Sequence, residues 1–151
     1  MLTSARRLRW MMNLWPPFLC TGIRVLTIAG DYRHARVRLK ARWYNRNYVG
    51  THFGGSLFAM TDPFVMLLAL HRLGRDYLVW DRAAEIEFVK AVREPVYAEF
   101  RMDDDVVAEL RAATAGGERH LRWFEVPVTT EAGDVVARVR KQLYVRRKPD
   151  R

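Results

Sequence analysis

The sequence has little cysteine and no spacing typical of a metal site. Cys20 is the only cysteine among 151 residues, so no intramolecular disulfide can form and no cysteine pair offers a zinc cage. A chain of this kind is typical of a reducing compartment, and we expect a cytoplasmic protein. His34, His71 and His120 have no metal-ligand spacing with one another or with carboxylates. We therefore predict no metal site.

Low-complexity tracts, internal repeats and long linkers are also absent. Half of the residues are hydrophobic and 28% are charged. These proportions exclude a mostly disordered chain, a collagen-like repeat and a polytopic membrane protein. The length suits one compact domain, which we expect to span residues 1–151.

Acidic residues are scarce at both ends of the chain. Asp31 is the only acid among residues 1–50, which carry a net charge of +9, and residues 136–151 carry +6. Residues 51–135 carry −6, and 22 of the 26 basic residues are arginine. Anionic partners would favour the two ends, and the arginine fork suits phosphate. An arginine-rich coding bias is the alternative explanation.

The N-terminal segment resembles a secretory signal only superficially. Its apolar stretch is broken by Asn13 and by Pro16-Pro17, and no small-x-small cleavage site follows. We predict an amphipathic helix over Thr3 to Trp15, ended by the proline pair within residues 1–20. Its inward face would carry Leu8, Met11, Met12 and Trp15. A helix lying on a membrane surface is the alternative.

A second helix is predicted over residues 53–72. From Phe53 to Leu70 the only charge is Asp62, and apolar residues surround the helix on every side, which is typical of a buried helix. The glycines, hydroxyls and proline in this run argue against a bilayer span. Pro63 removes one helical hydrogen bond, so we expect a bend next to Asp62.

Alternating segments predict an antiparallel sheet. The expected strands are Ile23–Ile28, His34–Trp43, Tyr77–Lys90, Val96–Met102, His120–Thr129 and Val135–Arg146, with a short helix at 104–114. In the second strand Val37, Leu39, Ala41 and Trp43 would point inward and the alternating Arg36, Arg38, Lys40 and Arg42 outward. The main strands, 77–146, would wrap around the hydrophobic helix as one α+β unit.

One segment carries a family resemblance. Asn47, Gly50, Thr51, Gly54, Gly55 and Asp62 match in identity and spacing the active-site segment of hotdog-fold acyl-CoA thioesterases of the phenylacetate-pathway type. The stretch from Asp76 to Ala84 is similar to an uncharacterised bacterial branch of tetrameric acyl-CoA thioesterases. The resemblance implies a hydrolase with a hotdog fold, an acyl-CoA substrate, and a homodimer or homotetramer with its active site at a two-fold interface.

The glycine pair and Asp62 are the principal site candidates. A Gly-Gly pair that opens a helix leaves backbone N–H groups free, as an oxyanion hole requires, although tight helix packing is an alternative. Asp62 could act as base or nucleophile, or could have a structural role with Thr51 or Arg82. It lies about 12 Å along the helix from Gly54, so the facing subunit would have to supply it.

Three further residues have two interpretations each. The family's histidine directly precedes the glycine pair, whereas here Phe53 has that place and His52 lies one position earlier, which leaves open whether His52 reaches the site. Asn47 could position the attacking water or act as a turn residue. For Asp81 we favour a salt bridge to Arg82 or Arg46 over an assisting catalytic role.

The substrate would supply its own CoA, so no separate cofactor is predicted. Candidate partners of the CoA phosphates are Arg138, Arg140, Arg146, Arg147 and Lys148, whose alternative is a solvated strand face and tail. The alternative function is a non-catalytic acyl-CoA or acyl-carrier-protein binding module. A hydratase and a basic nucleic-acid or membrane binder are less favoured, so we expect no nucleic acid partner and no membrane span.

Overall fold

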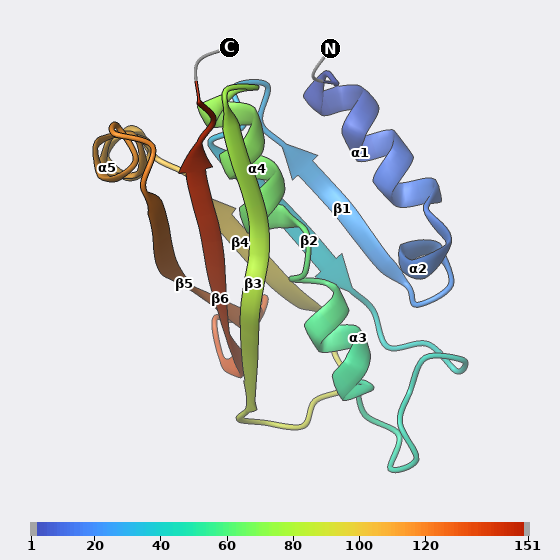
Figure 1. The fold of residues 1–151 in the computed structure, drawn as a ribbon. Helices are drawn as coiled ribbons and strands as arrows, with labels where there is room; N and C mark the ends of the chain where they lie inside the picture. Colours follow the sequence, from blue (N-terminus) through green and yellow to red (C-terminus); the bar gives the residue numbers. More distant parts are fainter. Residues whose placement is uncertain (1–2, 150–151) are drawn as a thin grey trace.

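The computed structural model describes residues 3–149, in which six strands form one antiparallel sheet (Figure 1). The strands are β1 (Ile23–Ile28), β2 (His34–Leu39), β3 (Tyr77–Phe88), β4 (Val96–Arg101), β5 (Arg119–Thr130) and β6 (Val135–Arg147). Their order across the sheet is β1-β2-β4-β5-β6-β3. The predicted α+β architecture, a sheet around a hydrophobic helix with an extra N-terminal helix, is confirmed.

Within the described residues, five helices accompany the sheet. They are α1 (Ala5–Leu14), α2 (Pro16–Leu19), α3 (Gly54–Ala59), α4 (Phe64–Leu73) and α5 (Asp104–Ala113). Successive segments α3 and α4 run along one face of the sheet, and α1 lies beside β1 (Figure 1). The proline pair that we expected to end the first helix opens the short helix α2, because proline suits the first turn of a helix.

The predicted central helix is broken where the sequence predicted a bend. Residues 60–63 form a turn between α3 and α4, and Pro63 directly precedes the first residue of α4. The whole segment, Gly54–Leu73, is long and apolar enough to cross a membrane. Half of its most apolar window is buried inside the chain, because it is the central helix packed on the sheet, and it is not a span.

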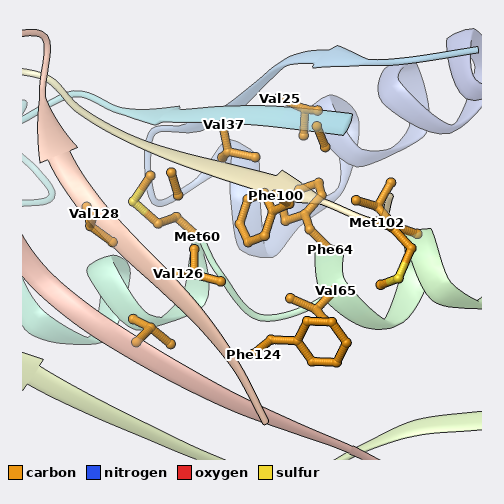
Figure 2. Close-up of a cluster of buried hydrophobic side chains, with 14 of the residues drawn as sticks. Val25, Val37, Met60, Phe64, Val65, Phe100, Met102, Phe124, Val126 and Val128 are labelled. Atoms are coloured by element: carbon orange, nitrogen blue, oxygen red, sulfur yellow. The ribbon is translucent and has the colours of Figure 1, made fainter. Parts of the chain in front are cut away.

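The core lies between the central helix and the inner face of the sheet. Met60, Phe64 and Val65 from the helix segment contact a layer of strand residues (Figure 2). The ring centroids of Phe64 and Phe100 are 4.9 Å apart. Alternation places every second residue of each strand in this layer. The packing fixes the helix against the sheet and therefore fixes the position of the glycine pair and of Asp62.

The two edges of the sheet differ. At β1 the side chain of Asn13 donates to the carbonyl oxygen of Val25 and accepts from its N–H, and Arg9 donates to the carbonyl oxygen of Leu26. Helix α1 thus covers the outer edge of β1. The other edge is the twelve-residue strand β3, and no described segment pairs with its outer side. Edge strands are usually protected in this way or paired with another strand.

Two of the four side chains that were predicted to face inward from the N-terminal helix do not do so. Leu8 and Met12 are buried, but Met11 and Trp15 are exposed. The buried row of α1 is Ala5, Leu8 and Met12, and Met11 is rotated about 100° from Met12 around the helix axis, outside this row. Trp15 follows the helix in an extended conformation, so the helical spacing no longer applies to it.

The second strand ends earlier than predicted. It stops at Leu39, the partner of the first residue of β1, and the chain then turns through Asn45, whose Oδ1 accepts from the N–H of Arg42 at 2.6 Å. Trp43 lies in this turn and is 88% exposed, so the expectation that it points inward is wrong.

Candidate active site

A buried lysine organises the acidic part of the site. Lys141 on β6 is 1% exposed, and its Nζ lies 2.8 Å from Asp62 Oδ1 and 3.3 Å from Asp81 Oδ2. Its Nζ also lies 6.0 Å from the ring centroid of Phe58. The ammonium group of Lys141 therefore links β6 to the break in the central helix, through Asp62, and to the neighbouring strand β3, through Asp81. We call Asp62, Asp81 and Lys141 the charged cluster.

This arrangement corrects two expectations. Asp62 is not buried: its side chain is 63% exposed, because the turn between α3 and α4 turns it outward. Asp81 does not pair with Arg82 or Arg46, since alternation from Tyr77 and Val79 places it on the inner side of β3, facing Lys141.

Lys141 was not among the predicted site residues, although the sequence contains a signal for it. Alternate residues of β6 from Val135 to Val145 are apolar except Lys141, so this cation stands in the inward-facing register. A lysine there requires carboxylate partners, because an unpaired buried charge is costly. The carboxylates that reach it are Asp81, in the inward register of β3, and Asp62, in the turn between α3 and α4.

Burial sets the titration of Asp81. Desolvation raises the pKa of this carboxyl above its ordinary value, and the nearby charge of Asp62 acts in the same direction. The ammonium of Lys141 lowers the pKa by attraction and by a hydrogen bond, but burial has the larger effect. The carboxyl of Asp81 therefore binds a proton at a higher pH than an ordinary aspartic acid does.

The two glycines begin α3 as predicted. The first N–H that donates within this turn belongs to Ser56 and reaches the carbonyl of Phe53 at 3.0 Å, so the N–H groups of Gly54 and Gly55 precede the helical hydrogen bonds. A Cβ on Gly54 would lie 2.8 Å from the Phe88 ring, and one on Gly55 would lie 2.4 Å from the Phe53 ring. A larger residue at either position would therefore require the exposed phenylalanine ring beside it to move.

The loop before α3 is held together by Asn47. Its Oδ1 accepts from the N–H of Thr51, and its Nδ2 donates to Thr51 Oγ1 and to the carbonyl oxygen of His52. Gly50 completes the turn with a φ of 82°, which favours glycine. Both amide atoms of the Asn47 side chain are thus used within the loop, as its interpretation as a turn residue requires.

His52 is buried and reaches the same region. Its Nε2 lies 2.7 Å from the carbonyl oxygen of Glu94, which can only accept, so this nitrogen carries the proton. The other ring nitrogen, Nδ1, is buried and has no partner. The exchange of histidine and aromatic residue relative to the family pattern therefore leaves His52 against Glu94 and places Phe53 against Gly55.

The candidate residues line two pockets. Asn47, His52 and Gly54 line a pocket of about 440 Å³ together with Phe88. Gly55 and Asp62 line a second pocket of about 310 Å³ with apolar walls from Trp15, Pro17, Phe18, Phe58 and Ala59. Within one chain the structure thus brings Gly55 and Asp62 to one pocket, and it does not bring Asp62 to the pocket that contains Gly54.

The five candidate CoA-binding cations are dispersed. Arg138 and Arg140 pair with Glu87 and Glu85 on the outer face of the sheet. These four residues line a pocket together with a third acid, Glu125. Side chains nearer the C-terminus bond to carbonyl oxygens: Arg146 to that of Gly117 and Lys148 to that of Arg75. Arg147 is partly exposed at the end of β6. Residues 138 and 146 are about 26 Å apart along the strand, so the five form no common phosphate site.

Within residues 3–149, no group of three or more His, Cys, Asp or Glu side chains could hold a metal ion.

The fold is similar to several solved structures. The protein PA5026 of Pseudomonas aeruginosa, described as a "Probable Thioesterase", superposes with a TM-score of 0.85 at 19% identity, over 97% of this chain and 98% of that one. The thioesterase HI1161 of Haemophilus influenzae gives 0.69 at 13% identity, over 99% and 98%. A mutant of the phenylacetic acid degradation protein PaaI of Thermus thermophilus gives 0.59 at 19%, over 85% and 97%.

These similarities show the hotdog fold that the sequence resemblance implied. No curated protein matches the chain. One family model does match, over residues 4–145, and it is described as a domain of unknown function, DUF4442. Nearly the whole chain is covered, and the protein therefore belongs to the DUF4442 family.

Proposed function

We propose that this protein is an acyl-CoA thioesterase that hydrolyses an acyl-CoA to the free acid and CoA. The observation that carries the proposal is the placement of Asp62. This carboxylate is exposed at a break in the apolar central helix, is held on one side by Lys141, and lines an apolar pocket together with Gly55. Its Oδ1 faces Lys141, which leaves Oδ2 available to a water molecule or an acyl carbon.

The reaction needs a polarised carbonyl and a nucleophile at its carbon. In the proposed reaction the N–H of Gly54 or Gly55 donates to the carbonyl oxygen, while Asp62 takes a proton from the attacking water. The C–S bond then breaks, and the CoA sulfur leaves as a thiolate that takes up a proton. Direct attack by Asp62, followed by hydrolysis of the resulting anhydride, would give the same products.

The proposed site is shared between two subunits. Asp62 and Gly54 of one chain line different pockets. Pairing of the open β3 edge with the same strand of a second copy would place the two central helices side by side across a two-fold axis. The carboxylate of one subunit would then face the amides of the other. We propose a homodimer of this kind as the active unit, and a homotetramer as a dimer of such dimers.

The alternative is a non-catalytic module that binds acyl-CoA or an acyl carrier protein. The contacts of Phe88 with Gly54 and of Phe53 with Gly55 support it, because the glycines then serve packing alone. Both rings are more than half exposed, so their rotation would give a ligand access to the amides. Both functions use the same pockets, and they differ in whether Asp62 performs chemistry.

Replacement of Asp62 by asparagine distinguishes the two functions. Asp62→Asn keeps the shape of the side chain and removes its basicity, so kcat for a panel of acyl-CoAs, followed by thiol release, should fall about 100-fold or more. Asp105→Asn, which removes an exposed carboxylate on α5, is the matched control and should leave kcat unchanged. Full turnover by Asp62→Asn would refute the mechanism, whereas absence of turnover in the unmodified protein with acyl-CoA still bound would favour the module.

A further inference from the structure

The N-terminal helices present an apolar face to solvent. Leu8 and Met12 occupy the buried side of α1, and the opposite side carries large apolar residues that continue into α2. We define the apolar N-terminal face as Trp10, Met11, Leu14, Trp15 and Leu19, which are between 45% and 64% exposed. Contiguous exposed apolar residues on a soluble protein usually mark an interaction surface.

This face is held outward by the sheet. Asn13 bonds in both directions to the backbone of Val25, and Arg9 donates to the carbonyl of Leu26. These bonds fix the rotation of α1 about its axis. Trp10, Met11 and Leu14 therefore cannot turn toward the core without breaking three hydrogen bonds to the edge strand.

A cationic groove borders the face. Trp10, Leu14 and Leu19 form one wall of a groove of about 330 Å³. The other wall is the outer surface of β1, β2 and the following turn, and it contributes Arg24, Arg38, Lys40, Arg42 and Tyr44. No acidic residue lines this groove. We call it the basic groove.

The cations of the basic groove lack carboxylate partners. Arg24 and Arg38 lie directly opposite each other in the β1–β2 ladder, an arrangement of like charges that destabilises a sheet. Arg36, two residues along the same strand, instead pairs with Glu99 and Glu131. Among the described residues, none of the four groove cations forms an ion pair with an acid. The groove therefore suits an external anion.

We propose that the apolar N-terminal face and the basic groove together dock the protein on the surface of an anionic phospholipid bilayer. Such a surface offers phosphates to the four cations and acyl chains to the five apolar residues, and tryptophan is favoured at that boundary. A soluble phosphate compound would occupy the groove but leave the apolar face in water. A second copy on this face would bring four more cations to the same contact.

Vesicle binding by the full chain tests the proposal. We expect the protein to float with vesicles of one part phosphatidylglycerol to three parts phosphatidylcholine and not with pure phosphatidylcholine, and the binding should weaken with added salt. Arg38→Gln combined with Arg42→Gln should lower the partition coefficient about 25-fold, at about fivefold for each cation near the surface. Trp10→Ser combined with Leu14→Ser should lower it at least tenfold.

A matched control separates the groove from net charge. Arg101→Gln combined with Arg119→Gln removes two exposed cations from β4 and β5 and should change partitioning less than twofold. The proposal is overturned by equal losses in this control, by no flotation with anionic vesicles at low salt, or by displacement with millimolar CoA. It is also overturned if Trp10→Ser with Leu14→Ser lowers the molar mass in solution, since a second copy would then cover the face. Asp62→Asn should float with anionic vesicles as the unmodified protein does, so the test of membrane docking does not depend on catalysis.

Discussion

Replacement of Lys141 by methionine removes the buried cation while keeping most of the volume of its side chain. Removal of one member of a buried ion pair costs about 3–5 kcal/mol, because the remaining charge stays desolvated. Asp62 is 63% exposed and rehydrates, whereas Asp81 at 22% keeps much of its desolvation. We therefore expect Lys141→Met to lower the free energy of unfolding by about 3 kcal/mol, the lower end of that range.

The loss can be measured by urea denaturation and by calorimetry. For a chain of this length about 3 kcal/mol corresponds to a decrease of roughly 6–12 °C in Tm. Adding Asp81→Asn to Lys141→Met should recover part of the loss, because the stranded carboxylate is then neutral. Lys141→Arg keeps the charge and should cost less than Lys141→Met.

Activity gives a second measurement that a merely structural role would not change. Lys141→Met removes the ammonium that lies 2.8 Å from Asp62 Oδ1 and holds this carboxylate in place, so kcat for thiol release should fall more than it does in Lys141→Arg, which keeps a cation there. Unchanged stability together with unchanged kcat in Lys141→Met would refute the reasoning.

Three other predictions concern single features of the structure. Because burial raises the pKa of Asp81, the folded protein binds a proton more readily than the unfolded chain, so the free energy of unfolding falls as the pH rises from about 4 through the pKa of Asp81 in the folded protein. Asp81→Asn should flatten this part of a curve of stability against pH. Phe88→Ala uncovers Gly54 and should raise kcat/KM if the ring limits access to the amide, which thiol release will show. Light scattering should give twice or four times the chain mass, and Val79→Pro on β3 should reduce the mass to that of one chain, because proline disrupts a strand ladder.

The fold was predictable because its signals are local and mutually consistent. Alternation predicted strand β1 at Ile23–Ile28, and the long, mostly apolar run predicted the central helix. The errors occur where a local rule competes with tertiary contacts. The alternation after Leu39 continues in the sequence as far as Trp43, but β1 offers no pairing partner there and Asn45 organises a turn instead.

The candidate site was only partly predictable. The glycine pair and Asp62 stand out from their own segment, since two glycines and one acid interrupt an apolar run. The charged cluster depends on three segments meeting, namely the turn between α3 and α4, β3 and β6. Alternation along β3 indicates which side of the strand Asp81 occupies, but not which residue of another segment lies opposite it. Lys141 could have been found by asking which charge occupies an apolar register.

The unequal edges of the sheet limit how copies of this chain can associate through their backbones. Helix α1 closes the β1 edge, so a strand from another molecule can add only at β3. When two chains join by their β3 strands, each loses its last open edge, and the joined sheet ends in a covered β1 on both sides. Growth by strand addition then stops at two chains. By covering the β1 edge, helix α1 therefore limits strand addition to two chains and protects the protein from forming fibrils.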